Sequence, residues 1–234
     1  MVLPLYLAVT GAEMSAFSEF SFPCAYMACH FSPYNGGLTS LPESLPENAI
    51  LILNDRMQCS GHSADLIAGQ LQETVDRFRC ESVLLDFQRP PDPESEVMVR
   101  TITRSLSCPV AVTERFARDL SCPVFLSPAP LHVPLQQHLA PWQDREIWLE
   151  AALGQEEVIL TGEGVRFVQQ FPPDSLTDGF YDEALCCHYQ TKVDENSIRF
   201  TLFDTHESLE RKLDLARSLG VSRAVGLWQE LGNL

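Results

Sequence analysis

Short apolar runs recur along the chain, and most of them are followed by a helical segment. Eight runs have the length and the aliphatic character of strands; they are Pro4–Thr10, Cys24–Phe31, Ala49–Asn54, Ser82–Gln88, Pro109–Thr113, Pro123–Ser127, Glu146–Ala151 and Arg223–Trp228. Runs such as ILILN at 50–54 are apolar at consecutive positions, which is typical of parallel strands that are covered on both faces. The pattern predicts the α/β class and a compact (β/α)8 TIM barrel.

Helical periodicity supports three of the connections between these strands. Between the third and fourth strands, Ser63 is expected to be an N-cap, because apolar residues follow it at spacings of three and four. A second helix is predicted over 94–106. A third is predicted over 204–219, where Asp204 and Glu207 resemble a capping box.

Residues 156–203 interrupt the alternation of strands and helices. They form two β-rich hairpin patterns, one that turns at Gly162–Gly164 and one that turns at Asp194–Asn196. We therefore expect a single TIM-barrel domain over 1–234, in which 156–203 is a β-rich insertion before the last helix.

The composition is that of a globular protein with a strongly acidic charge. Apolar residues make up 45% of the chain and charged residues 21%, which excludes a disordered or collagen-like chain. The net charge is −16, so the chain lacks the basic surface that nucleic acids and anionic membranes require. The N-terminal sequence has no positively charged region typical of a signal peptide, and no apolar stretch approaches the ~20 residues that cross a bilayer. We expect a cytoplasmic protein without nucleic-acid or membrane partners.

Eight cysteines are spread over the chain, and we interpret them as reduced, buried thiols rather than a disulfide scaffold. Neither Cys186-Cys187-His188 nor the segment Cys24–His30 has the paired spacing of a zinc site. The Gly-x-Gly turn of the first hairpin is not followed by a helix, as a phosphate-binding loop would be. Serine-hydrolase and zinc-protease motifs are missing as well. The sequence thus predicts no metal and no cofactor.

The C-terminal part of the chain carries a more specific signal. In order, it contains Phe180-Tyr181-Asp182-Glu183, a hairpin, Phe203-Asp204, a helix with Ser208-Leu209 and Lys212-Leu213, and then Val225-Gly226-Leu227-Trp228 with Leu231-Gly232. This order resembles the end of glycoside hydrolase family 18, which includes chitinases and spore-cortex-lytic enzymes. The resemblance implies a barrel whose eighth strand supplies an active-site tryptophan, here Trp228.

The resemblance also identifies where the catalytic motif should lie. The family's fourth strand carries Asp-x-x-Asp-x-Asp-x-Glu, in which the last Asp orients the N-acetyl group of the substrate and the Glu protonates the leaving oxygen. The aligned segment here is ESVLLDFQ at 81–88. Asp86 matches the last Asp, whereas Leu84 replaces the middle Asp and Gln88 replaces the Glu. A carboxamide has no titrating proton, so Gln88 cannot act as the general acid.

A second departure lies at the sixth strand. There the family places Met-x-Tyr-Asp to hold the N-acetyl group, and this chain has FLSP at 125–128. Substrate-assisted hydrolysis of the family type is therefore not expected, although the mouth of the barrel can still bind sugar.

Asp86 and Gln88 alternate along a strand and stand at its C-terminal end. Because barrel sites lie at that end, we expect both side chains to line a pocket. The alternative is that Asp86 only caps a loop or pairs with Arg89.

Other strand ends add candidates for the same pocket; these are His30, Asn54, Asp55, Glu114 and Glu150. We expect His30, Asn54 and Trp228 to contact a ligand, with Trp228 as a stacking platform for a sugar. A plain core tryptophan is the alternative for Trp228. Glu114 is the carboxylate that we would test as a relocated acid, with a solvated or helix-capping Glu as its alternative.

Three functions follow from this sequence. The leading one is a chitinase-like barrel with impaired hydrolysis that binds an N-acetylglucosamine-containing glycan, such as a chitin or peptidoglycan fragment. The second is a divergent, active glycosidase in which Glu114 or Asp86 serves as the acid. The third is a structural protein without a ligand, for example in a spore coat, where the thiols could cross-link.

Overall fold

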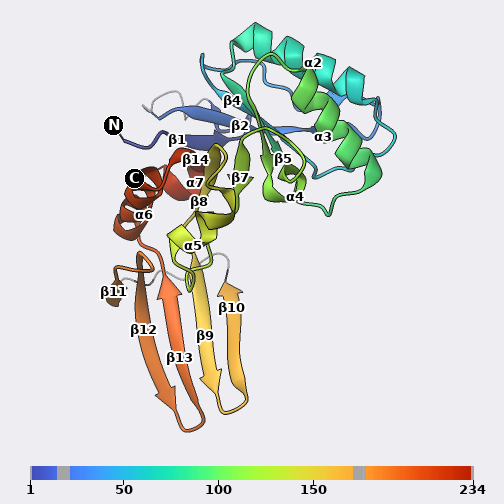
Figure 1. The fold of residues 1–234 in the computed structure, drawn as a ribbon. Coiled ribbons are helices and arrows are strands. Elements are labelled where there is room, and N and C mark those ends of the chain that lie inside the picture. Colours follow the sequence, from blue (N-terminus) through green and yellow to red (C-terminus); the bar gives the residue numbers. More distant parts are fainter. Residues whose placement is uncertain (1, 15–21, 171–175, 177, 233–234) are drawn as a thin grey trace.

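A computed structural model describes residues 2–14, 22–170, 176 and 178–232 of the chain. Its centre is a closed barrel of parallel strands (Figure 1). In barrel order the strands are β1 (Leu5–Val9), β14 (Val221–Leu227), β8 (Ile147–Ala151), β7 (Val124–Leu126), β6 (Val110–Thr113), β5 (Ser82–Asp86), β4 (Ile50–Asn54) and β2 (Cys24–Phe31), and the pairing of β1 with β2 closes the ring. The predicted TIM-type barrel is confirmed.

Helices cover the outside of this barrel and follow most of its strands. Their bounds are α2 (Ala64–Phe78), α3 (Pro93–Ser105), α4 (Glu114–Ala117), α5 (Leu135–Leu139), the 3-10 helix η1 (Ala140–Trp142), α6 (His206–Ser218) and α7 (Trp228–Leu231). Ser63 is the N-cap of α2, as predicted, and its side chain accepts a hydrogen bond from the N–H of Leu66. A short strand, β3 (Leu38–Thr39), pairs antiparallel with β2.

The predicted cap of the helix over 204–219 was wrong by one residue. The N-cap of α6 is Thr205, and the capping box joins Thr205 to Ser208 rather than Asp204 to Glu207. Asp204 instead forms an ion pair with Lys212. A hydroxyl at the N3 position can satisfy the N-cap N–H as a carboxylate would, which releases Asp204 for this contact.

Alternate residues of the strands form two separate layers of core. One layer fills the barrel, and its members include Tyr6, Ile50, Ile52, Leu84, Phe125 and Trp148. The other layer packs between the strands and the helices, and it includes Leu51, Leu53 and Leu85 with Ile67 and Leu71 of α2. Both faces of each strand are buried, which explains the consecutive apolar residues of the sequence.

A second sheet lies in the chain between β8 and α6. It is antiparallel, and its order is β10 (Gly164–Gln170), β9 (Gln155–Thr161), β13 (Ser197–Phe203), β12 (Cys187–Asp194) and β11 (Phe180–Asp182). The two hairpins turn where the sequence predicted, between β9 and β10 and between β12 and β13. The ends of these hairpins extend away from the barrel (Figure 1).

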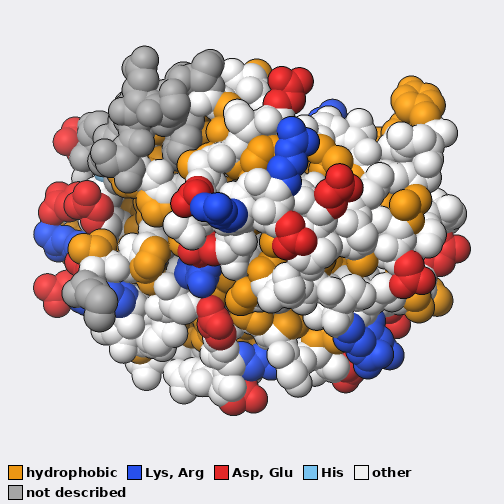
Figure 2. Space-filling view, turned by 90° about the horizontal axis from the view of Figure 1, so that it is seen from above, with side chains coloured by type: hydrophobic (Ala, Val, Ile, Leu, Met, Phe, Trp, Pro, Cys, Tyr) orange, Lys and Arg blue, Asp and Glu red, His pale blue; other side chains and the backbone are white. Residues whose placement is uncertain are grey.

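Acidic and basic side chains are interspersed on the face of the molecule that Figure 2 shows. None of the helices in the described part of the chain combines the length and the apolar character needed to span a bilayer.

Candidate functional site

A cavity of about 550 Å³ opens at the C-terminal ends of the barrel strands. Its apolar lining comes from the barrel interior, with Ile52, Leu84, Phe125 and Val225. Its polar lining includes Thr10, His30, Asn54, Asp86, Gln88 and Glu150. The volume lies within the range of about 300–1,000 Å³ that is typical of small-molecule sites.

β5 supplies the centre of this site. Leu84, Asp86 and Gln88 all line the cavity, whereas Leu85 and Phe87 between them are almost fully buried on the other side of the strand. This alternation follows from the period of two along an extended chain. Asp86 lies opposite Asn54 in the register of β5 against β4, so the strand presents Asp86 to the cavity as the alternation predicts.

Asp86 and Gln88 are directly connected. Nε2 of Gln88 donates a hydrogen bond to Oδ1 of Asp86, with a distance of 2.5 Å between the two atoms. Burial raises the pKa of Asp86, the hydrogen bond from Gln88 lowers it, and the charge of Asp55 raises it further. The amide of Gln88 thus stabilises the charged form of a carboxylate that its surroundings otherwise disfavour.

Asp55 holds the loop that carries Gln88. Its Oδ1 accepts from the backbone N–H of Gln88 at 3.0 Å, and its Oδ2 accepts from that of Arg89 at 2.8 Å. The side chain of Arg89 donates to the backbone oxygen of Asp55 at 3.0 Å. Arg89 therefore contacts Asp55 and the backbone of Arg56 rather than Asp86.

Glu150, near the end of β8, lies in the same cavity. Burial raises the pKa of Glu150 to about 7, and the negative charges of Asp86 and Glu230 add to the rise. Near neutral pH this side chain is therefore divided between its acid and its carboxylate. Unlike Gln88, whose amide donates hydrogen bonds but has no titrating proton, and unlike an ordinary exposed glutamate, it can donate a proton near neutral pH.

His30 and Asn54 both line the cavity, with different freedom to bind a ligand. Nδ2 of Asn54 donates to the backbone oxygens of Met27 and Cys29, each at 3.0 Å. These bonds span the register shift of β2 against β4, so Asn54 positions the end of β2. Nδ1 of His30 lies 2.8 Å from the backbone oxygen of Ala28, an arrangement in which Nε2 is the acceptor of the neutral ring.

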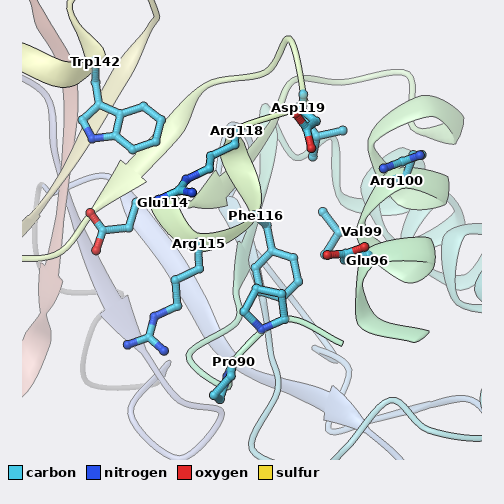
Figure 3. A pocket seen from close by; sticks show the side chains of 12 residues that line it. Pro90, Glu96, Val99, Arg100, Glu114, Arg115, Phe116, Arg118, Asp119 and Trp142 are labelled. Atoms are coloured by element: carbon cyan, nitrogen blue, oxygen red, sulfur yellow. The ribbon is translucent and has the colours of Figure 1, made fainter. Parts of the chain in front are cut away.

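Glu114 does not line the cavity that contains Asp86. It begins α4 and lines a groove of about 580 Å³ between α3 and α4, which Figure 3 shows. The labelled side chains there include Arg115 and Phe116 of α4, Arg100 of α3, and Trp142. The structure thus does not bring Glu114 together with Asp86.

Trp228 also lies outside the lining of the barrel-mouth cavity. It begins α7, is half-buried and packs against the outer core layer. A Cβ atom added to Gly232 would lie 2.7 Å from Cε3 of its ring, so the ring lies across this glycine. Gly226 and Leu227, the residues just before Trp228, line the cavity instead.

Two further positions that the sequence aligned with family motifs have structural roles, one just before β5 and one in β7. Glu81, which aligns with the first Asp of the family motif, precedes β5 at the opposite end of the barrel. It accepts a hydrogen bond from Oη of Tyr6 at 2.6 Å and pairs with Arg223. Phe125 contributes an apolar wall to the cavity, in the strand where the family places Met-x-Tyr-Asp.

Arg56 was not predicted as a site residue, yet it lines the cavity. It follows Asp55 directly after β4, and this location beyond a strand end is the only signal that the sequence offered. It brings a cation to the rim of a cavity whose other charged groups are carboxylates.

All eight cysteines are free thiols, and six of them are buried. Among the described residues, no three His, Cys, Asp or Glu side chains are grouped so as to hold a metal ion.

No protein-family model and no curated protein sequence matches the chain. Solved structures do resemble it, at low sequence identity. The spore cortex-lytic enzyme SleL from Bacillus cereus is 13% identical, with a TM-score of 0.54 over 96% of this chain and 70% of the enzyme. A family 18 chitinase from Cycas revoluta, solved in complex with (GlcNAc)4, is 11% identical, with a TM-score of 0.58 over 95% of this chain and 94% of the chitinase.

A third resemblance is to a family 18 N-acetylglucosaminidase from Paenibacillus barengoltzii. It is 9% identical, with a TM-score of 0.51 over 96% of this chain and 94% of that enzyme. These three matches extend over 95–96% of this chain. The chain has the fold of glycoside hydrolase family 18 barrels, the resemblance that its C-terminal sequence predicted.

Proposed function

We propose that the mouth of the barrel binds a glycan that contains N-acetylglucosamine, and that the hydrolytic mechanism of family 18 is impaired. The observation that carries this proposal is the position of Gln88 inside the cavity, with its amide bonded to Asp86. An amide in the place of the proton donor removes a contribution of about 10²–10⁴-fold to the rate. The cavity itself is retained, so binding does not depend on the lost acid.

The chemistry of the lining suits a sugar. Pyranose rings present apolar C–H faces, which match the floor formed by Leu84, Phe125 and neighbouring barrel residues. Sugar hydroxyl and N-acetyl groups are donors and acceptors, which match Asp86 as an acceptor and Glu150 in its protonated form as a donor. Structures of the Cycas revoluta chitinase with (GlcNAc)4 and with allosamidin support this choice of ligand class.

Isothermal titration calorimetry with N-acetylglucosamine oligomers and peptidoglycan fragments tests the proposal. We expect millimolar or tighter binding, and we expect Asp86→Ala to weaken it by about tenfold or more, because a hydrogen bond to a charged group is lost. Glu114→Gln, in the other groove, is the matched control and should leave binding unchanged. If no glycan binds the wild-type chain at millimolar concentration, the proposal is wrong.

A second function is favoured by one specific observation, the raised pKa of Glu150 within the same cavity. A general acid must be protonated near the working pH, and Glu150 meets this requirement. In this second proposal the chain is a divergent glycosidase in which Glu150, rather than Glu114, replaces the missing acid.

Turnover of a panel of aryl glycosides and chitin oligomers separates the two proposals. If the chain is a glycosidase, Glu150→Gln abolishes turnover, Glu114→Gln does not, and the wild-type rate falls as the pH rises through about 7, where the acid ionises. If the wild-type chain binds glycans and shows no turnover on any substrate, the first proposal stands and the second is removed.

A further inference from the structure

We propose that the cavity at the barrel mouth prefers an amino sugar whose 2-amino group is free and positively charged, and that the carboxyl groups of Asp86 and Glu150 bind this group. The inference rests on the proposed function and specifies the kind of sugar that the cavity receives. Asp86 belongs to β5 and Glu150 to β8, and both line the cavity. Since β6 and β7 lie between these two strands in the barrel, the carboxyl groups enter the cavity from separate parts of its wall.

The neutral side-chain donors on the partly buried wall of the cavity are already used within the protein. Oγ1 of Thr10 donates to Oε2 of Glu13 at 2.8 Å. Nδ2 of Asn54 donates to two backbone oxygens of β2, which uses both of its protons. Nδ1 of His30 lies 2.8 Å from the backbone oxygen of Ala28. The side-chain donors that remain belong to exposed residues at the rim, which are Ser40, Arg56 and Gln88.

The acceptors of the same wall remain open. Among the residues that the structure describes, no hydrogen bond or ion pair reaches the carboxyl group of Glu150. Only one oxygen of Asp86 accepts a hydrogen bond, from Gln88, and Nε2 of the neutral His30 ring is a further acceptor. An ammonium group donates three protons and accepts none, whereas the carbonyl oxygen of an N-acetyl group needs a donor. The partly buried wall therefore matches a free amine better than an N-acetyl group.

The charges around Glu150 also favour a cation. Besides Asp86 and His30, the titratable and charged groups that line this cavity, line the small cavity that Glu150 also borders, or act on Glu150 through their charge are Asp55, Arg56, Glu156, Glu230 and the pair of Asp204 with Lys212. Of the two cations, Lys212 is bound to Asp204 and Arg56 lies at the exposed rim. A positively charged ligand offsets the remaining negative charge, which a neutral sugar cannot do.

A bound ammonium group should change the protonation of Glu150. Burial, together with the charges of Asp86 and Glu230, raises the pKa of Glu150 to about 7, so at pH 6 this side chain is mostly protonated in the free protein. A cation beside it favours the charged form and lowers this pKa. The amine of the sugar has a pKa close to that of an α-amino group, about 7.7–8.0, so it is a cation at pH 6. Binding at pH 6 should therefore release a proton from Glu150.

Isothermal titration calorimetry with two sugars of equal length tests the inference; the probes are the trimers of glucosamine and of N-acetylglucosamine. At pH 7 we expect the glucosamine trimer to bind about tenfold more tightly, because hydrogen bonds to charged groups are the stronger ones. At pH 6 we expect its binding to release about half a proton or more, which titrations in buffers of different ionisation enthalpy measure. Binding of the N-acetylglucosamine trimer should not release one.

Glu150→Gln is the test variant, and Glu163→Gln is its matched control. Glu150→Gln should abolish the proton release and most of the preference for the glucosamine trimer, whereas its amide can still donate to a neutral sugar. Glu163 lies at the exposed turn between β9 and β10, so the same substitution there changes the net charge equally and should leave both measurements as in the wild type. Circular dichroism checks that both variants fold.

Spermidine, a polyamine without a sugar ring, separates selective binding from general attraction to a chain with a net charge of −16. It should bind at least about tenfold more weakly than the glucosamine trimer. Equal binding of spermidine and the glucosamine trimer, or a proton release that persists in Glu150→Gln, would overturn the inference. If the N-acetylglucosamine trimer binds and the glucosamine trimer binds no more tightly, this inference fails while the proposed function stands. If neither trimer binds at millimolar concentration, both are wrong.

Discussion

Glu150 and Asp86 lie in one cavity near the ends of β8 and β5, where burial and then the charge of Asp86 raise the pKa of Glu150 to about 7. The folded chain therefore holds a proton that the unfolded chain releases near the ordinary pKa of 4.5. This difference links stability to pH. It also makes the cavity a site whose charge changes across the neutral range.

The stability of the chain should fall as the pH rises through this range because of Glu150. The contribution of the bound proton is fully present below about pH 4.5 and is lost as the pH passes 7. At about 1.4 kcal/mol per pKa unit, the loss amounts to about 3 kcal/mol. Glu150→Gln cannot ionise, so at pH 8 it should exceed the wild type in free energy of unfolding by about 2–3 kcal/mol, and at pH 5 the two should be similar. Urea denaturation at both pH values measures this, and equal differences at pH 5 and pH 8 would contradict it.

Gln88→Glu introduces the residue that the resembling family 18 motif carries at this position, and we predict that it does not produce hydrolysis. The new carboxyl would stand where an amide now donates to Asp86 at 2.5 Å, and two carboxyls this close share one proton. We expect the variant to lose about 1–2 kcal/mol relative to the wild type at pH 8 and to recover near pH 5. Turnover of an aryl chitobioside should stay at background, because Leu84 and Phe125 occupy other positions of the family's machinery. Gln88→Met is the control, because it removes the hydrogen bond to Asp86 without adding a second carboxyl, and its pH dependence should be smaller than that of Gln88→Glu.

Most of the fold could be predicted from the sequence, because a strand that is buried on both faces is apolar at consecutive positions. ILILN at 50–54 becomes β4, with Ile52 inside the barrel and Leu51 and Leu53 beneath the helices. The cap of α6 could not be settled in this way. Asp204 and Thr205 are both good N-caps, and the choice depends on Lys212, which reaches Asp204 only in the folded chain.

The site could be predicted only in part, for a related reason. Asp86 and Gln88 follow from alternation along one strand, which is a local property. The raised pKa of Glu150 depends on its burial beside Asp86 and Glu230, which come from other segments. Glu114 and Glu150 both lie at the ends of barrel strands in the sequence. Glu150 is still part of β8, whereas Glu114 begins the short helix α4 and lines another groove.

The cysteines should differ in reactivity according to their burial. Cys108 and Cys122 are partly exposed, and the other six are buried. Burial raises the pKa of Cys29 to about 12, and it does the same for Cys24 with a contribution from Cys80. Because the thiolate is the reactive form, brief iodoacetamide treatment at pH 8 should label Cys108 and Cys122 first. Mass spectrometry of peptides identifies the labelled positions, and labelling of all eight in the folded chain at one rate would contradict this prediction.

Lys212 and Asp204 form the buried ion pair that joins α6 to the end of β13. Nζ of Lys212 lies 2.7 Å from Oδ1 and 2.9 Å from Oδ2 of Asp204, and the side chains are only 11% and 2% exposed. Asp204 also accepts a hydrogen bond from the N–H of Gly154 at 3.2 Å. Gly154 lies where the chain enters the inserted sheet and Asp204 where it leaves, so this side chain connects the two segments that join the sheet to the barrel. Lys212→Met would leave a buried carboxylate without its cation, and we expect a loss of about 3–5 kcal/mol in the free energy of unfolding.

The neighbouring position offers a control for this loss. Arg211 pairs with Glu207 at 2.7 Å on the exposed side of α6, so Arg211→Met removes the same charge from the same helix without leaving a buried partner. Its effect on stability should be small, because exposed ion pairs contribute little. The double variant Lys212→Met with Asp204→Asn should recover part of the loss, since the uncompensated charge is removed. Urea denaturation of the three variants measures these changes in the free energy of unfolding. Equal losses from Lys212→Met and Arg211→Met would show that Asp204 does not depend on its buried partner.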